Sequence, residues 1–135
     1  MCDPSSDDDV LEAVFRHQFA HNAAQRREAA ALYCLALGGD QDPSADFLRR
    51  FAAHRPPVAA ASRCALTEGG EVQDRENGAP ALLFRVTALR RLGEDEAEAH
   101  AEYLEGWLSG AGSTYRVVRQ AGQWVVTDDR MRWIS

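Results

Sequence analysis

The chain has 135 residues, 45% of them hydrophobic, and a formal net charge of −6 at pH 7. This length suits a single domain that can bury a core without a metal or a disulfide to hold it. Four aspartates and no basic residue lie within the first nine positions, so residues 10–135 carry a net charge of only −2. A body this close to neutral argues against nucleic acid or an anionic membrane as a partner, and we expect neither. A basic patch on one face stays open, and its candidates are the pairs Arg26-Arg27, Arg49-Arg50 and Arg90-Arg91.

Arginine supplies all fifteen basic side chains, and the lack of lysine excludes Schiff-base and P-loop chemistry. The three cysteines, Cys2, Cys34 and Cys64, are odd in number and widely spaced, which fits neither a disulfide framework nor a zinc site. We therefore expect reduced thiols, a cytoplasmic location and no cofactor. We also expect neither a membrane span nor a signal peptide, because no apolar run has the required length or flanks.

The sequence opens with a tail and a helix. Residues 1–9 are interpreted as a disordered acidic tail, and residues 10–135 as a single α+β domain, with Asp9 capping a helix over about 9–23. A turn of about 100° per residue places one set of side chains on a common side of that helix. These residues are Leu11, Val14, Phe15, Gln18 and Asn22, with Phe19 beside them.

Residues 24–38 allow two interpretations. The alanines at 29–31 favour a helix, whereas residues 32–37 (LYCLAL) could form a short buried strand that ends at the following pair of glycines. Periodicity cannot decide between the two in so short a run, and both remain open.

A second helix is expected after this segment. Asp42 can cap it, and Pro43 suits its first position because the missing N–H would have no partner there. The helix should run through Ala53 and end before Pro56-Pro57.

The middle of the chain has the pattern of strands. Residues 58–66 could be a strand and 67–80 a loop, and the alternation over 81–92 predicts a strand with Leu82, Phe84, Val86 and Ala88 on one side. After a turn at 93–95, residues 96–108 alternate alanine with glutamate and histidine. Their composition also favours a helix, but the short turns and strands around them favour a strand.

The last part of the chain predicts a hairpin. Residues 109–113 are expected to form a turn, and 114–119 and 123–127 to pair around Gln120-Ala121-Gly122. A local turn with an ion pair is expected at 128–130, before a closing segment at 131–134. The sheet should bury two large anchors, Trp124 and Trp133, against a helix.

A first helix followed by a meander that closes on residues 115–126 (YRVVRQAGQWVV) resembles the cystatin-like, cone-shaped fold of the nuclear transport factor 2-like superfamily. The likeness covers residues 80–135 and rests on the aromatic–x–apolar strand, the x-Gly-x-Trp turn and the final tryptophan. It implies N-terminal helices packed on a curved, mainly antiparallel sheet with a C-terminal four-strand meander, a conical cavity and a dimer formed through the sheet. Some members are isomerases, cyclases or dehydratases with an Asp/His pair in the cavity, and others are not enzymes. No catalytic residue of those enzymes matches a position here.

Residues 42–48 (DPSADFL) also resemble bacterial proteins of this size that carry no assigned activity.

Several polar residues are candidates for a site. The amides of Gln18 and Asn22 interrupt an apolar stripe, so they either bond to sheet backbone or buried water, or line a cavity and orient a polar ligand. His17 and His21 are four residues apart, so both rings can point the same way. A metal site would need a third ligand, and we expect no bound metal. A histidine in the glutamate-rich face of 96–102 could act as a general base, although a solvated strand has the same pattern. The candidate ligand-binding residues are Gln18, His21, Asn22, His100 and Tyr103.

Two functions agree with these features. The first is a small non-catalytic module that binds a small-molecule ligand or a protein, and that forms a homodimer covering Tyr103, Trp107 and Tyr115 if these side chains face outward. The alternative is a small cavity enzyme that transfers protons on a hydrophobic metabolite.

Overall fold

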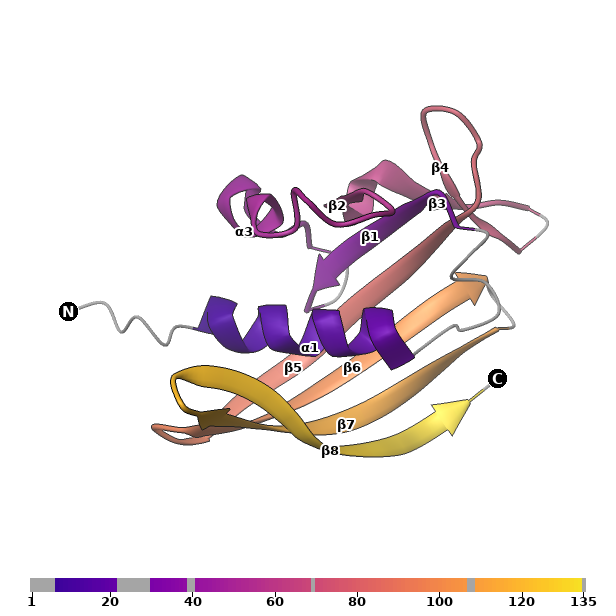
Figure 1. Cartoon of the computed structure of the whole chain (residues 1–135). Helices are drawn as coiled ribbons and strands as arrows, with labels where there is room; N and C mark the ends of the chain where they lie inside the picture. The colour runs from indigo at the N-terminus through magenta and orange to yellow at the C-terminus, as the bar shows by residue number, and fades with distance from the viewer. Residues whose placement is uncertain (1–6, 22–29, 39–40, 69, 107–108, 135) are drawn as a thin grey trace.

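The computed structural model of the chain describes residues 7–21, 30–38, 41–68, 70–106 and 109–134. One long helix lies across the concave side of a curved sheet, and the strands of the C-terminal half pass beneath it (Figure 1). The elements are, in chain order, α1 (Asp7–His21), β1 (Leu32–Leu37), α3 (Ala45–Arg49), β2 (Val58–Ala60), the 3-10 turn η1 (Ala61–Arg63), β3 (Cys64–Leu66), β4 (Val72–Asp74), β5 (Ala81–Gly93), β6 (Glu96–Gly106), β7 (Ser109–Gln120) and β8 (Gln123–Ile134).

Six strands form the large sheet, in the order β2-β1-β5-β6-β7-β8. Strands β5 to β8 pair antiparallel with their neighbours in sequence, whereas β1 runs parallel to both β2 and β5. Strands β3 and β4 form a second, two-stranded sheet. The expected α+β class, with a large, mostly antiparallel curved sheet and a four-strand C-terminal meander, is confirmed. No helix in the described ranges has both the length and the apolar character to cross a membrane.

Helix α1 begins at Asp7, so Asp9 lies within its first turn rather than before it as a cap. The aspartates of this turn are favourable because the helix dipole places partial positive charge there. The expected apolar side is buried and carries Val10, Leu11, Val14, Phe15, Gln18 and Phe19. Asn22 lies outside the described residues.

Strand β1 resolves one of the two open assignments. Residues 32–36 are all buried, because the strand has a parallel partner on each side and layers on both faces. A continuous apolar run is typical of such a strand, which explains why no alternation marked it in the sequence.

The predicted N-cap residue of the second helix, Asp42, is wrong. Ser44 occupies the N-cap position of α3, and its Oγ accepts a hydrogen bond of 3.1 Å from the backbone N–H of Phe47. The carboxylate of Asp42 instead accepts bonds from the N–H and the hydroxyl of Ser62, at 2.9 and 2.7 Å. The helix ends at Arg49, and turns rather than helix continue to residue 53.

The alternation over β5 and β6 is confirmed with one change. Leu82, Phe84 and Val86 face the core, but a bulge between Val86 and Ala88 reverses the pattern, so Ala88 is exposed and Leu89 packs against the core. Residues 96–106 are a strand, which resolves the second open assignment, and the alanines at 97, 99 and 101 are buried. Residues 107–108 lie outside the described part.

Two turns predicted near the C-terminus are wrong. Residues 109–113 belong to β7, and the strand continues through the glycines at 110 and 112. The small side chains of Ala111 and Ser113 are buried. Residues 128–130 belong to β8, which a bulge opposite Arg116 and Val117 bends without interrupting. The ion pair expected there is confirmed, with Arg130 Nε 3.2 Å from Asp128 Oδ2. The hairpin itself is confirmed, with Ala121 and Gly122 both at positive φ in a two-residue turn.

The anchoring role of tryptophan is confirmed in part. Trp124 is half-buried on the helix-facing side of β8, and the guanidinium carbons of Arg91 and Arg119 lie 5.0 and 5.8 Å from its ring centroid. The side chain of Trp133 falls outside the described part of the structure.

The expectation of reduced thiols is wrong for Cys34 and Cys64, whereas Cys2 lies outside the described residues. Cys34 on β1 and Cys64 on β3 form a disulfide, with Cα atoms 6.2 Å apart. It lies in a small apolar cluster with Leu32, Val72 and Ala81, between the two sheets. The two cysteines are 30 residues apart in the sequence, so their spacing did not predict the disulfide that the fold allows.

Candidate functional site

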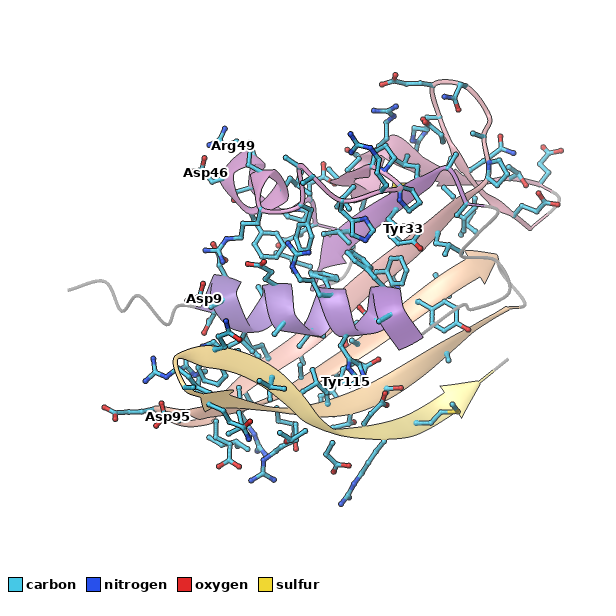
Figure 2. All side chains as sticks on the ribbon, in the orientation of Figure 1. Asp9, Tyr33, Asp46, Arg49, Asp95 and Tyr115 are labelled. Carbon is cyan, nitrogen blue, oxygen red and sulfur yellow. A yellow bond between two sulfur atoms is a disulfide. The ribbon has the colours of Figure 1, made fainter. Side chains whose placement is uncertain are left out.

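Two groups of polar and aromatic residues flank α1 (Figure 2). On one side, Phe19 of α1 packs on Tyr33 of β1, with ring centroids 5.0 Å apart. On the other side, His17 packs edge-on against Tyr115 of β7, at 5.1 Å. Figure 2 labels both tyrosines, one on each side of the helix. The first group surrounds a cleft, and the second forms a compact polar cluster.

We name the first group the aromatic cleft. Its volume is about 620 Å³, within the range of roughly 300–1,000 Å³ that is usual for small-molecule sites. Three segments form its walls: α1, the start of β1, and the turn between α3 and β2. The lining residues are Arg16, Phe19, Ala20, Ala30, Tyr33, His54, Arg55 and Pro56.

Packed rings give the cleft a rigid apolar wall. The ring of His54 lies 4.8 Å from Phe19 and 5.5 Å from Tyr33, centroid to centroid. Phe19 and Tyr33 are almost fully buried, and both pack on Phe84 of β5 at 5.0 Å. Because β5 belongs to the centre of the sheet, the wall is part of the core and not of a loose loop.

The hydrogen bonds of His54 assign its protonated nitrogen. Its Nδ1 lies 2.8 Å from the carbonyl oxygen of Pro56, and a carbonyl can only accept, so Nδ1 carries the proton. In the neutral ring Nε2 is therefore an acceptor. Among the described residues, Nε2 of this histidine has no hydrogen-bond partner. The cleft thus has one imidazole nitrogen that a bound molecule can engage.

Two guanidinium groups border the cleft, and they differ in their partners. Arg16 donates from Nε to Glu12 at 2.8 Å and from Nη2 to the carbonyl of Arg50 at 2.9 Å, and it covers the Phe51 ring. Arg55 is exposed and donates from Nη1 to the carbonyl of His54 at 2.9 Å. Arg16 is thus held on the surface of α1 by its partners, whereas Arg55 contacts only the backbone of its own segment among the described residues.

We name the second group the His–Asp cluster. His17 Nε2 lies 3.0 Å from Asp129 Oδ2 on β8, the strand that pairs with β7. Burial raises the pKa of the Tyr115 phenol, and the negative charge of Asp129 adds to this shift, while a hydrogen bond with Ser113 opposes it. Tyr115 is fully buried and is therefore a neutral phenol at physiological pH.

Gln18 joins the interior beside this cluster. Its Nε2 donates to the backbone carbonyl of Glu102 on β6, at 3.2 Å, which is the bond to sheet backbone considered from the sequence. Its Oε1 is buried and has no hydrogen-bond partner in the described part of the chain. A buried acceptor of this kind costs free energy unless water or another group meets it.

The structure brings together only some of the residues expected to bind a ligand. Gln18 and Tyr103 both face the interior, and the Tyr103 ring lies 6.4 Å from that of Phe84. His100 faces the opposite side of the sheet, where its Nδ1 lies 3.0 Å from the Thr114 hydroxyl. Asn22 and the side chain of His21 lie outside the described residues.

The face that carries His100 is a row of ion pairs. Glu102 pairs with Arg85 at 2.6 Å and Glu98 with Arg90 at 3.5 Å, and Glu96 pairs with an arginine of β7. The carboxylates are thus used in cross-strand pairs, as expected for a solvated strand face. No group of three His, Cys, Asp or Glu side chains that could hold a metal ion occurs among the described residues.

The aromatic cleft was missed by the sequence-based prediction. His54 and Arg55 had no special spacing, and they meet Phe19 and Tyr33 only because the turn after α3 folds back over α1. Comparisons of the chain with protein-family models, with curated proteins and with solved structures found no match.

Proposed function

We propose that this protein is a small non-catalytic binding module, and that the aromatic cleft takes one small, mainly apolar molecule. The observation that carries the proposal is a cleft of about 620 Å³ whose wall of packed rings includes an imidazole with an unused nitrogen. Apolar walls with a few placed polar groups are typical of ligand sites. The buried rings are already fixed by the core, so binding requires little ordering of side chains.

Ligand-observed and protein-observed NMR with a set of one- and two-ring aromatic fragments tests the proposal. We expect fragments to bind and to shift resonances of Phe19, Tyr33 and His54. Ala20 is exposed and lines the cleft, so Ala20→Trp should fill the cleft and abolish binding without disturbing the core. Ala45→Trp, on the exposed surface of α3, is the matched control and should bind as the wild type does. Binding that survives Ala20→Trp, or no fragment binding at all, would contradict the proposal.

A second function, proton transfer on a hydrophobic metabolite, is favoured by the His–Asp cluster. A carboxylate that holds an imidazole can orient it and stabilise its charged form, which is the arrangement of a general acid or base. Isomerase and dehydratase substrates offered to the wild type and to His17→Gln test this function. Turnover that is lost in His17→Gln but kept in His100→Gln would support it, and turnover unaffected by His17→Gln would exclude it.

Membership of the nuclear transport factor 2-like superfamily is part of the same proposal. It is supported by the order of the elements, a helix on the concave side of a curved sheet that ends in a four-strand meander. The superfamily would place a conical cavity between α1 and the sheet, where the His–Asp cluster lies.

The homodimer remains a proposal, but the positions of Tyr103 and Tyr115 do not support it. Tyr115 is fully buried and Tyr103 packs against the core, so neither ring faces outward as the expected contact required. Trp107, the third residue of that contact, lies outside the described residues. Light scattering across a concentration series measures the assembly directly. The cytoplasmic location also loses its support, because disulfides persist mainly in oxidising compartments.

A further inference from the structure

The charges around the aromatic cleft are not balanced. Among the residues that the structure describes, its lining holds two arginines, one histidine and no acidic residue. Arg16 is compensated by Glu12, and Arg50 beneath it pairs with Asp9 at 2.8 Å and with Glu12 at 3.0 Å. These contacts neutralise the side of the cleft that α1 forms.

Arg55 has no such compensation in the described part of the chain. Among the described residues no carboxylate lies within ion-pair distance of its guanidinium, and the contact it does make is the bond to the His54 carbonyl. That contact uses one of five N–H donors. The remaining donors stay available, and their exposure means that an approaching anion costs them little desolvation.

The Arg55 charge and the His54 imidazole belong to one segment of the cleft lining. His54, Arg55 and Pro56 are consecutive and all line the cleft. The bond from His54 Nδ1 to the Pro56 carbonyl ties the two ends of this segment together across Arg55. The cleft therefore has an apolar wall on α1 and β1, and an edge with hydrogen-bonding and positive groups.

On these grounds we infer that the molecule bound in the aromatic cleft is a small carboxylic acid with a flat apolar body, its carboxylate held at Arg55 and its body against Phe19 and Tyr33. This inference rests on the proposed binding function and adds the chemical class of the ligand. Guanidinium binds carboxylate through charge-assisted, often paired hydrogen bonds. The aromatic wall supplies the burial that a free carboxylate alone would lack.

Calorimetry with two matched compounds tests the inference on the full chain. The compounds are 2-naphthoate and 2-naphthylmethanol, which share a body and differ in charge. The wild type should bind the carboxylate at least about tenfold more tightly than the alcohol, as one charge-assisted contact would provide. Arg55→Gln should remove this preference, because it should lower the affinity for the carboxylate far more than the affinity for the alcohol. Arg130→Gln, at an exposed arginine of β8, is the control and should keep the preference.

The outcomes separate this inference from the proposed function. Equal affinity for the two compounds, with binding still blocked by Ala20→Trp, would overturn the carboxylate inference and leave the cleft as a binding site. A preference that survives Arg55→Gln would also overturn it. If neither compound bound the wild type, the proposed function would fail, and the inference would fail with it.

Discussion

The disulfide between Cys34 and Cys64 allows a quantitative test of how the small sheet is held to the large one. Reduction of the folded protein removes the cross-link without removing any heavy atom, so the loss of stability contains no contribution from a new cavity. The cross-link closes a loop of 30 residues in the unfolded chain. The loop-entropy relation then predicts a loss of about 3.6 kcal/mol of stability on reduction.

Urea denaturation of oxidised and reduced protein measures this loss, in a Cys2→Ser background that prevents exchange with the third cysteine. Thermal unfolding should show a drop in Tm of roughly 10 °C for a chain of this size. The double variant Cys34→Ala/Cys64→Ala should resemble the reduced protein with a further loss, because Cys34 is fully buried. Equal denaturation midpoints with and without reductant, or an intact mass showing two free thiols in the untreated protein, would refute the reasoning.

Three further predictions concern single side chains. Trp124→Ala should cost about 2–3 kcal/mol in urea denaturation, less than for a fully buried tryptophan, and a midpoint equal to that of wild type would contradict its packing against the core. Arg63 binds Asp74 through Nε–Oδ1 and Nη2–Oδ2 contacts of 2.8 and 3.1 Å and lowers the pKa of that carboxyl. The pair therefore stabilises the protein above the ordinary carboxyl pKa and loses this effect in acid, so the stability difference between wild type and Asp74→Asn should shrink below about pH 4. The raised pKa of Tyr115 keeps its phenol neutral in the folded state while the unfolded state ionises near pH 10, so stability should fall above that pH. Tyr115→Phe should lessen this alkaline loss, and an identical loss in both proteins would show that the phenol is not held neutral.

Strand alternation and helix periodicity predicted most of the fold. The buried side of α1 and the core-facing alanines of β6 were readable because each follows a simple period of 3.6 or 2 residues. The hairpin before Trp124 was readable from its glycine. These signals are local, and the elements they describe occupy the positions that the pattern implies.

Features that depend on distant contacts or on bulges were not readable. Gly110 and Gly112 mark turns by composition, yet β7 continues through them because its partners on both sides supply the pairing. The bulge after Val86 shifts the inward position from Ala88 to Leu89, and a two-residue period cannot show this. 

The candidate sites were hidden for the same reason. His17 meets Asp129 across 112 residues, and His54 meets Phe19 through the fold of the turn after α3. Gln18 was singled out correctly as an amide in an apolar stripe, and its Nε2 bonds to the Glu102 carbonyl while its Oε1 has no partner among the described residues.

The most direct measurement is an NMR titration of the four imidazoles with 2-naphthoate, each assigned by substitution. If the aromatic cleft is the binding site, the His54 resonances should shift in a saturable manner together with ring signals of Phe19 and Tyr33. The signals of His100, on the opposite side of the sheet, should stay unchanged. A saturable shift at His100 or His17 with none at His54 would contradict the account.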